Sequence, residues 1–192
     1  MVCIADDVEP PAVPRVDLML CGSVGRDITT FIPDGENLNE VESCAPDAET
    51  QALLITRSGN AFNGVRLLAY LQAGGIVITE YANADNVWNA IFPAQQVQQG
   101  ALNNGCTDNI NPPVRLNLGD TFWQDNGALA AHVGPPGCGH DLSGFPDITP
   151  LGGWNANNVS LAYRDVGGGR LWLVESDWQD RDPLFSAESL AL

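Results

Sequence analysis

Apolar runs and helical patterns alternate along the first half of the chain. Short apolar runs at residues 16–21, 52–56 and 76–79 are bounded by glycine-containing turns, which is the pattern of buried β-strands. A weaker apolar pattern at 38–44 predicts one more strand. Because the clear strands are almost continuously apolar, we expect a sheet that is covered on both faces.

Two amphipathic helices are predicted between and after these strands. The first spans about 61–73, and the glycine pair 74–75 ends it. The second helix begins with Asn83 or Asp85 as its N-cap residue. Its buried face is predicted to hold Val87, Trp88, Ile91 and Phe92. Strands that alternate with helices predict an α/β fold with a mostly parallel sheet, and right-handed crossovers make it doubly wound.

The second half of the chain has a different composition. Residues 93–160 are rich in Asn, Gly, Pro and Gln, so we expect a loop-rich insertion of short strands and turns. Two later apolar runs, 160–163 and 170–174, are joined by a glycine-rich turn and predict a β-hairpin or paired strands. Residues 1–14 are acidic and proline-rich and predict an extended arm. The predicted organisation is this arm followed by a single domain, 15–192.

The charge of the chain excludes several classes of function. There are 24 acidic residues against 8 basic ones, which gives a net charge of −16, and every basic residue is Arg. This charge repels phosphate backbones, so nucleic-acid binding is not expected. The absence of Lys excludes Schiff-base and pyridoxal chemistry and a P-loop, and no cofactor is predicted. Since no run of 18 apolar residues exists, membrane insertion is not expected either.

Five cysteines, at positions 3, 21, 44, 106 and 138, leave at least one thiol free if all disulfides form within the chain. Cys106 and Cys138 flank the loop-rich region and are the predicted disulfide pair. Cys21 lies in an apolar strand and is interpreted as a small buried apolar residue. The composition favours an extracellular or virion-associated protein over a cytoplasmic one.

Three segments carry a resemblance to a known group: the strand ALLIT, the stretch RLLAYLQAGGIVITE and the late stretch GGGRLWLVESDWQD. They resemble the class I glutamine amidotransferase-like, flavodoxin-like superfamily over roughly 15–92 and 160–192. The resemblance implies a flavodoxin-like sheet. In catalytic members, the strand after the Ala-Gly-Gly turn leads into a nucleophile elbow that carries Cys.

The catalytic residues of that group are missing from the matching positions. The elbow reads Thr-Glu-Tyr-Ala-Asn-Ala over 79–84 and holds no Cys, Ser or Gly. The group also needs a late His, but His132 and His140 lie in the insertion and Glu-Ser-Asp occupies 175–177. Without thiolate and imidazole, acyl transfer has neither nucleophile nor base. No catalytic role is therefore carried over from the resemblance.

The carboxyl ends of the parallel strands would form the usual ligand crevice of such a sheet. The residues predicted there are Ser23, Arg57, Ser58, Glu80, Tyr81, Glu175 and Asp177. An Arg between carboxylates suits a small anion or a sugar. We favour the alternative, a structural ion-pair network that closes the end of the sheet.

The sequence contains two candidate metal sites. The candidate zinc ligands are Cys106, His132, Cys138, His140 and Asp141, but their spacing matches no standard structural zinc pattern. A Cys106–Cys138 disulfide with two surface histidines is favoured. Asp177, Asp180 and Asp182 offer oxygens to calcium, although a solvated acidic turn is the preferred interpretation. Residues 158–160 also form an N-glycosylation sequon, Asn-Val-Ser.

These observations favour a non-catalytic structural or interaction domain, part of a larger assembly such as a virion or a cell-surface structure. A protein partner or self-association is expected. One alternative is a hydrolase of an ester or glycan, with Glu80, Glu175 or Asp177 as the acid/base pair. Another is a small-ligand or calcium-binding module.

Overall fold

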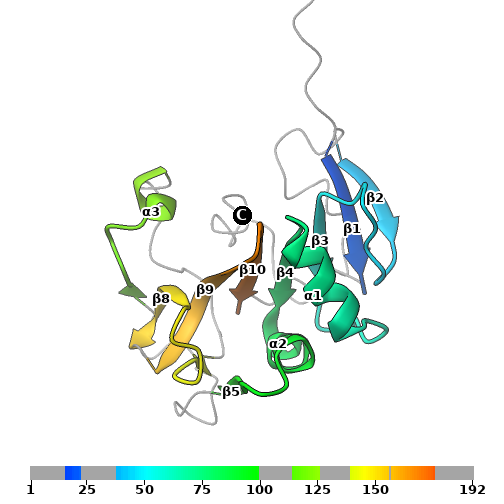
Figure 1. Cartoon of the computed structure of the whole chain (residues 1–192). Coiled ribbons are helices and arrows are strands. Elements are labelled where there is room, and N and C mark those ends of the chain that lie inside the picture. The colour runs from blue at the N-terminus through cyan, green and yellow to red at the C-terminus, as the bar shows by residue number, and fades with distance from the viewer. Residues whose placement is uncertain (1–15, 23–37, 100–113, 126–138, 156, 176–192) are drawn as a thin grey trace, which may run out of the picture.

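A ten-stranded sheet forms the centre of the molecule (Figure 1). The computed structural model describes residues 16–22, 38–99, 114–125, 139–155 and 157–175, and the fold of the chain follows from these ranges. The predicted arm, 1–14, and the predicted disulfide pair, Cys106 and Cys138, lie outside the described residues.

Five parallel strands make up one half of the sheet, in the order β2-β1-β3-β4-β10. They are β1 (Val16–Cys21), β2 (Leu38–Glu42), β3 (Ala52–Ile55), β4 (Ile76–Glu80) and β10 (Gly169–Val174). This is the strand order of a flavodoxin-like sheet. All five strands fall on runs that the hydrophobic pattern predicted.

The predicted insertion extends the sheet beyond β10. Strand β9 (Asn158–Val166) pairs antiparallel with β10, as the predicted hairpin requires. The other strands of this half are β5 (Gln98–Gln99), β6 (Val114–Arg115), β7 (His140–Asp141) and β8 (Thr149–Asn155). Both β7 and β8 pair with β9, while β5 pairs with β7 and β6 with β8. Seven of the ten strands point in the same direction, and β5, β6 and β9 are antiparallel to them. In this sense the sheet is mostly parallel.

Two helices follow the parallel strands where the pattern placed them. Helix α1 (Gly64–Gln72) begins after Asn63, whose side chain accepts a hydrogen bond from the Arg66 amide. A 3₁₀ turn, η3 (Tyr81–Asn83), leads from β4 into α2 (Ala84–Ile91). Asn83 occupies the N-cap position of α2, but its side chain makes no capping bond. Within the described ranges, no helix is long and apolar enough to cross a membrane.

The sheet buries one apolar cluster on each face. The first cluster joins alternate residues of β1, β3, β4 and β10 to the buried faces of both α1 and α2. Figure 1 shows these two helices on the same side of β3 and β4. The second cluster joins the intervening strand residues to the short helix α3 (Thr121–Asp125). The predicted doubly wound arrangement is therefore not confirmed within the described residues.

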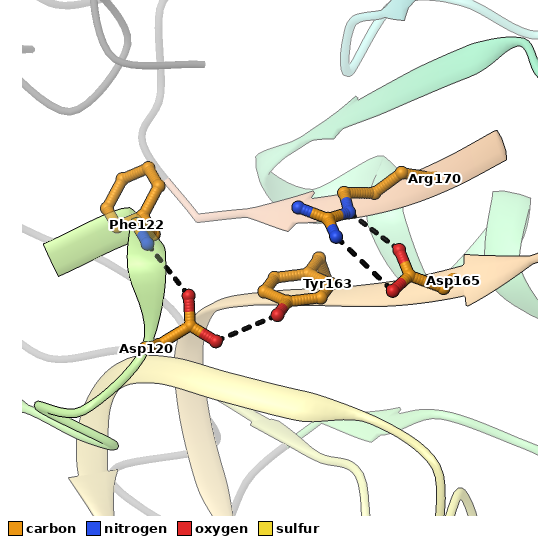
Figure 2. Close-up of polar contacts among 5 residues, drawn as sticks. All are labelled: Asp120, Phe122, Tyr163, Asp165 and Arg170. Atoms are coloured by element: carbon orange, nitrogen blue, oxygen red, sulfur yellow. Dashed lines mark hydrogen bonds and ion pairs between the residues drawn. The ribbon is translucent and has the colours of Figure 1, made fainter. Parts of the chain in front are cut away.

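Helix α3 is fixed to the sheet by polar contacts (Figure 2). Asp120 caps the helix, since one of its carboxylate oxygens accepts from the Phe122 amide at 2.9 Å. The other oxygen accepts from the Tyr163 hydroxyl at 2.8 Å. The Arg170 guanidinium lies 3.8 Å from the centre of the Tyr163 ring and is paired with Asp165. This network connects α3 to β9 and β10.

A disulfide joins Cys21, at the end of β1, to Cys44, just beyond β2. The sequence interpretation of Cys21 as a plain apolar residue was therefore wrong, although the residue is fully buried. The pairing follows from the topology, because β1 and β2 are parallel neighbours and their carboxyl ends lie side by side. The bond ties the segment after β2 to the carboxyl end of β1.

Candidate functional site

Glu80 closes the carboxyl end of β4 and is fully buried. Its Oε2 accepts a hydrogen bond from the backbone amide of Arg57 at 2.8 Å. This contact is set by the register, since Ile55 at the end of β3 lies opposite Thr79. The carboxylate therefore holds the segment that follows β3.

Asn83, at the end of η3, contacts the same segment. Its Nδ2 donates to the carbonyl oxygens of Thr56 at 2.9 Å and Gly59 at 2.5 Å. Gly59 packs so closely on β1 that a Cβ there would overlap the carbonyl of Cys21. The segment after β3 is thus fixed by Glu80 and Asn83, and the amide of Asn83 is used here rather than in capping α2.

Tyr81 occupies the turn between β4 and α2, where the resemblance places the nucleophile elbow. Its backbone has φ of +48°, in the left-handed region that non-glycine residues seldom adopt. Such a conformation costs roughly 1–2 kcal/mol and is characteristic of the strained strand-to-helix turn of nucleophile elbows. The turn after β4 therefore shares this backbone conformation, and the residue that adopts it is a half-buried Tyr.

His140 and Glu175 form a buried pair at the end of β10. The His140 Nδ1 lies 2.7 Å from the Glu175 Oε1, and the side chains are 2% and 0% exposed. The approach is short but off the hydrogen-bond direction, so we describe it as an ion pair. Both residues adjoin β9: His140 lies opposite Val159, and the Glu175 amide donates to the Ser160 carbonyl at 2.9 Å. The pair thus links the ends of β10 and β7.

The electrostatics of this pair favour its charged form. Burial lowers the pKa of His140, but the attraction of Glu175, with a smaller contribution from Asp85, outweighs burial, so that the pKa is raised above 6.5. Asp85 lies in the first turn of α2.

The predicted crevice residues divide into two groups. Arg57, Ser58, Glu80, Tyr81 and Glu175 do lie at or just beyond the carboxyl ends of β3, β4 and β10. The other two, Ser23 and Asp177, lie outside the described residues. So do the metal-site candidates His132, Asp180, Asp182, Cys106 and Cys138.

Sequence reasoning missed the position of His140. The prediction of a surface histidine was wrong, because pairing of β7 with β9 buries the side chain beside Glu175. A two-residue strand carries no periodicity, so no sequence signal could have found this contact. Asn158 of the sequon is 3% exposed and is not accessible to glycosylation in the folded chain. Among the described residues, no group of three His, Cys, Asp or Glu side chains could hold a metal ion. His140 and Asp141, two of the candidate zinc ligands, are therefore not part of such a group.

Comparisons with known proteins identify the fold and nothing finer. No protein-family model matches the chain, and no curated protein does. A solved ThuA-like protein from Bacteroides uniformis matches with a TM-score of 0.56 at 12% identity, over 97% of this chain and 92% of that one. A β-galactosidase from Rahnella sp. R3 matches with a TM-score of 0.50 at 13% identity, over 92% of this chain but 30% of that one. The ThuA-like neighbour has the class I glutamine amidotransferase-like fold, and this chain shares that fold.

Proposed function

We propose that this chain is a non-catalytic interaction domain within a larger extracellular assembly, such as a virion or a cell-surface structure. In this proposal, a doubly wound, class I glutamine amidotransferase-like scaffold has lost its catalytic residues and retains a binding role. A protein partner or a second copy of the chain is the expected ligand.

The burial of Glu80 and Glu175 carries the proposal. Both side chains are 0% exposed, and each is in contact with the protein itself, the Arg57 amide or the His140 ring. A general acid or base must reach the proton that it transfers, directly or through one water molecule. Carboxylates placed in this way serve to join strand ends, which disfavours the alternative hydrolase.

Two further features support an extracellular assembly. Disulfides such as Cys21–Cys44 persist in oxidising compartments. A net charge of −16 suits solubility in a salty medium. The same fold also forms 30% of a longer β-galactosidase chain, so it is compatible with use as one part of a larger protein.

The catalytic half of the proposal is tested with ester and glycoside substrates. We expect no turnover above background for the unaltered chain, and Glu80→Gln and Glu175→Gln should change thermal stability alone. Glu49→Gln is the matched control, because Glu49 is exposed and precedes β3, whereas Glu80 and Glu175 lie at the carboxyl ends of β4 and β10. Turnover that is abolished by either buried substitution and retained in the control would establish the hydrolase instead.

The assembly half is tested by light scattering on size-exclusion fractions and by affinity capture from the native source. We expect self-association or a specific co-purifying protein. A stable monomer that captures nothing from its source would contradict the proposal.

A further inference from the structure

A groove of about 640 Å³ lies between helix α1 and the segment that connects β2 to β3. The α1 wall is a stripe of residues at positions i, i+3, i+4 and i+7, which share one face of a helix. The lining residues are Arg66, Ala69, Tyr70 and Ala73 of this stripe, Gly74 and Gly75 after it, and Pro46, Asp47, Ala48, Thr50 and Gln51 of the connecting segment. Since none of them takes part in the contacts of Glu80, Asn83 or His140 described above, the groove is a separate feature of the surface.

Hydrogen bonds join the two walls of the groove. The Arg66 Nε donates to the Pro46 carbonyl at 3.2 Å, and the Tyr70 hydroxyl donates to the Thr50 carbonyl at 3.0 Å. The Tyr70 ring also lies against the backbone of Gly75, where an added Cβ would overlap it. The walls are therefore fixed before any partner arrives, which lowers the entropy cost of binding.

The Arg66 guanidinium has hydrogen-bond donors to spare. Its Nη atoms make no hydrogen bond or ion pair within the ranges that the structure describes. In contrast, the guanidinium groups of Arg164 and Arg170 are paired with Asp147 and Asp165. A guanidinium that is held through its Nε still presents N–H groups in a planar fork, and this fork matches the two oxygens of a carboxylate.

Asp47 limits the charge that the groove can accept. Its Oδ1 accepts hydrogen bonds from the amides of Glu49 and Thr50 at 3.0 Å and from the Thr50 hydroxyl at 2.9 Å. The bond from the Thr50 side chain, followed by the bonds from the two amides, lowers the pKa of Asp47, so the carboxylate is ionised at neutral pH. It repels a phosphate dianion more strongly than a single carboxylate, and the net charge of −16 acts in the same direction.

The groove is open to solvent. Arg66, Ala69 and Ala73 on one wall, and Asp47 and Gln51 on the other, are exposed. Sites for small molecules enclose most of the ligand surface. An open groove with small side chains on its helical wall suits instead a short segment of a protein, one side of which stays in solvent.

We propose that this groove binds a short segment of a protein partner through one Asp or Glu side chain, whose carboxylate pairs with the Nη atoms of Arg66. The residues beside that carboxylate pack on Ala69, Ala73 and the Tyr70 ring. This inference rests on the proposed interaction domain and names the surface that it uses.

An NMR titration of the full chain with the peptide acetyl-Ala-Pro-Glu-Pro-Ala-amide tests the site. We expect shifts of the backbone amides of 47–51 and 66–75. The matched peptide with Gln in place of Glu should bind about tenfold more weakly, because it lacks the charge-assisted pair. Equal binding of the two peptides, or no shift at peptide concentrations up to about 10 mM, would overturn the proposal.

Two substitutions separate the charge of the groove from its shape. Arg66→Gln should abolish the preference for the Glu peptide. Ala69→Phe, at an exposed helix position, fills the groove but keeps Arg66, and it should abolish the binding of both peptides. Val65→Ala is the matched control, because Val65 is 79% exposed on the same helix and does not line the groove. Thermal melts show that each variant is folded, and a preference for Glu that persists in Arg66→Gln contradicts the pairing.

Other occupants of the groove give different results. Acetate that reproduces all the peptide shifts would assign the groove to small acids, and shifts of the same amides on dilution without peptide would assign it to a second copy of the chain. Either result overturns the proposed partner segment. If a partner captured from the native source binds Arg66→Gln and Ala69→Phe as tightly as the unaltered chain, the groove is not the interface, although the proposed interaction domain stands.

Discussion

At the residue scale, the ion pair of His140 and Glu175 is the contact that joins the insertion to the end of the parallel sheet. Such a buried pair adds little net stability compared with apolar residues of the same shape. Removing one partner, however, leaves a buried charge uncompensated, which typically costs about 3–5 kcal/mol. The charges that face His140 from the packed elements are Glu175 of the β10 end and Asp85 of α2. The stability of the fold should therefore depend on the protonation of this histidine.

We predict that His140 makes the free energy of unfolding fall as the pH rises. The pKa of His140 is raised in the folded chain, so its contribution is complete below the unfolded value of 6.5 and is lost as the pH rises through the folded pKa. Urea unfolding between about pH 6 and pH 9 measures this slope. His140→Gln should remove that part of it, and Asp85→Asn should reduce it. A slope that is the same in His140→Gln and in the unaltered chain would show that the pair does not titrate in this range.

At the element scale, α3 depends on tertiary contacts, because a helix of five residues has little stability of its own. Besides the Asp120 contacts of Figure 2, the indole of Trp123 donates to the carbonyl oxygens of Leu116 and Leu151 at 2.9 and 3.1 Å. Burial and the carboxylate of Asp120 raise the pKa of Tyr163, so its hydroxyl remains a donor over the ordinary pH range. Asp120 is the residue on which both the cap and the link to β9 depend.

We predict that Asp120→Ala destabilises the chain by about 2–3 kcal/mol, from the lost cap and the lost hydrogen bond of the Tyr163 hydroxyl. Hydrogen exchange should show the largest loss of protection in α3 and β9. Asp125→Ala, at the exposed end of the same helix, should change stability by less than about 0.5 kcal/mol. Equal effects of the two substitutions would mean that Asp120 has no special role.

The elements were predictable to the extent that their residues follow a periodic pattern. Strands β1, β3 and β4 and helices α1 and α2 were found because each buries a continuous or helical run of apolar residues. The carboxyl ends of β4 and β10 then placed Glu80 and Glu175 at the same end of the sheet. Contacts that depend on strand pairing were not predictable: the Cys21–Cys44 disulfide needs β1 beside β2, and the burial of His140 needs β7 beside β9. Local sequence carries no record of which distant strands become neighbours.

At the scale of the whole molecule, the imbalance of 24 acidic and 8 basic residues works against the compact state. Like charges repel within the folded chain, and salt screens this repulsion over a Debye length that falls from about 30 Å at 0.01 M to about 10 Å at 0.1 M. Salt also weakens exposed pairs such as Arg170–Asp165, but pairs of this kind contribute only about 0–1 kcal/mol each. Repulsion should therefore dominate the response to salt.

We predict that raising NaCl from about 0.01 M to about 0.5 M raises the Tm by several degrees, because screening removes self-repulsion in the folded state. KCl should have the same effect at equal ionic strength, since screening does not distinguish the two cations. Calorimetry with EDTA and with CaCl₂ at matched ionic strength separates screening from the alternative calcium module. A bound ion would raise the Tm at a calcium concentration far too low to screen charge, and EDTA would reverse that rise. If the Tm depends on ionic strength alone, the acidic residues act as a solvated surface and not as a calcium site. The proposed extracellular interaction domain requires this result.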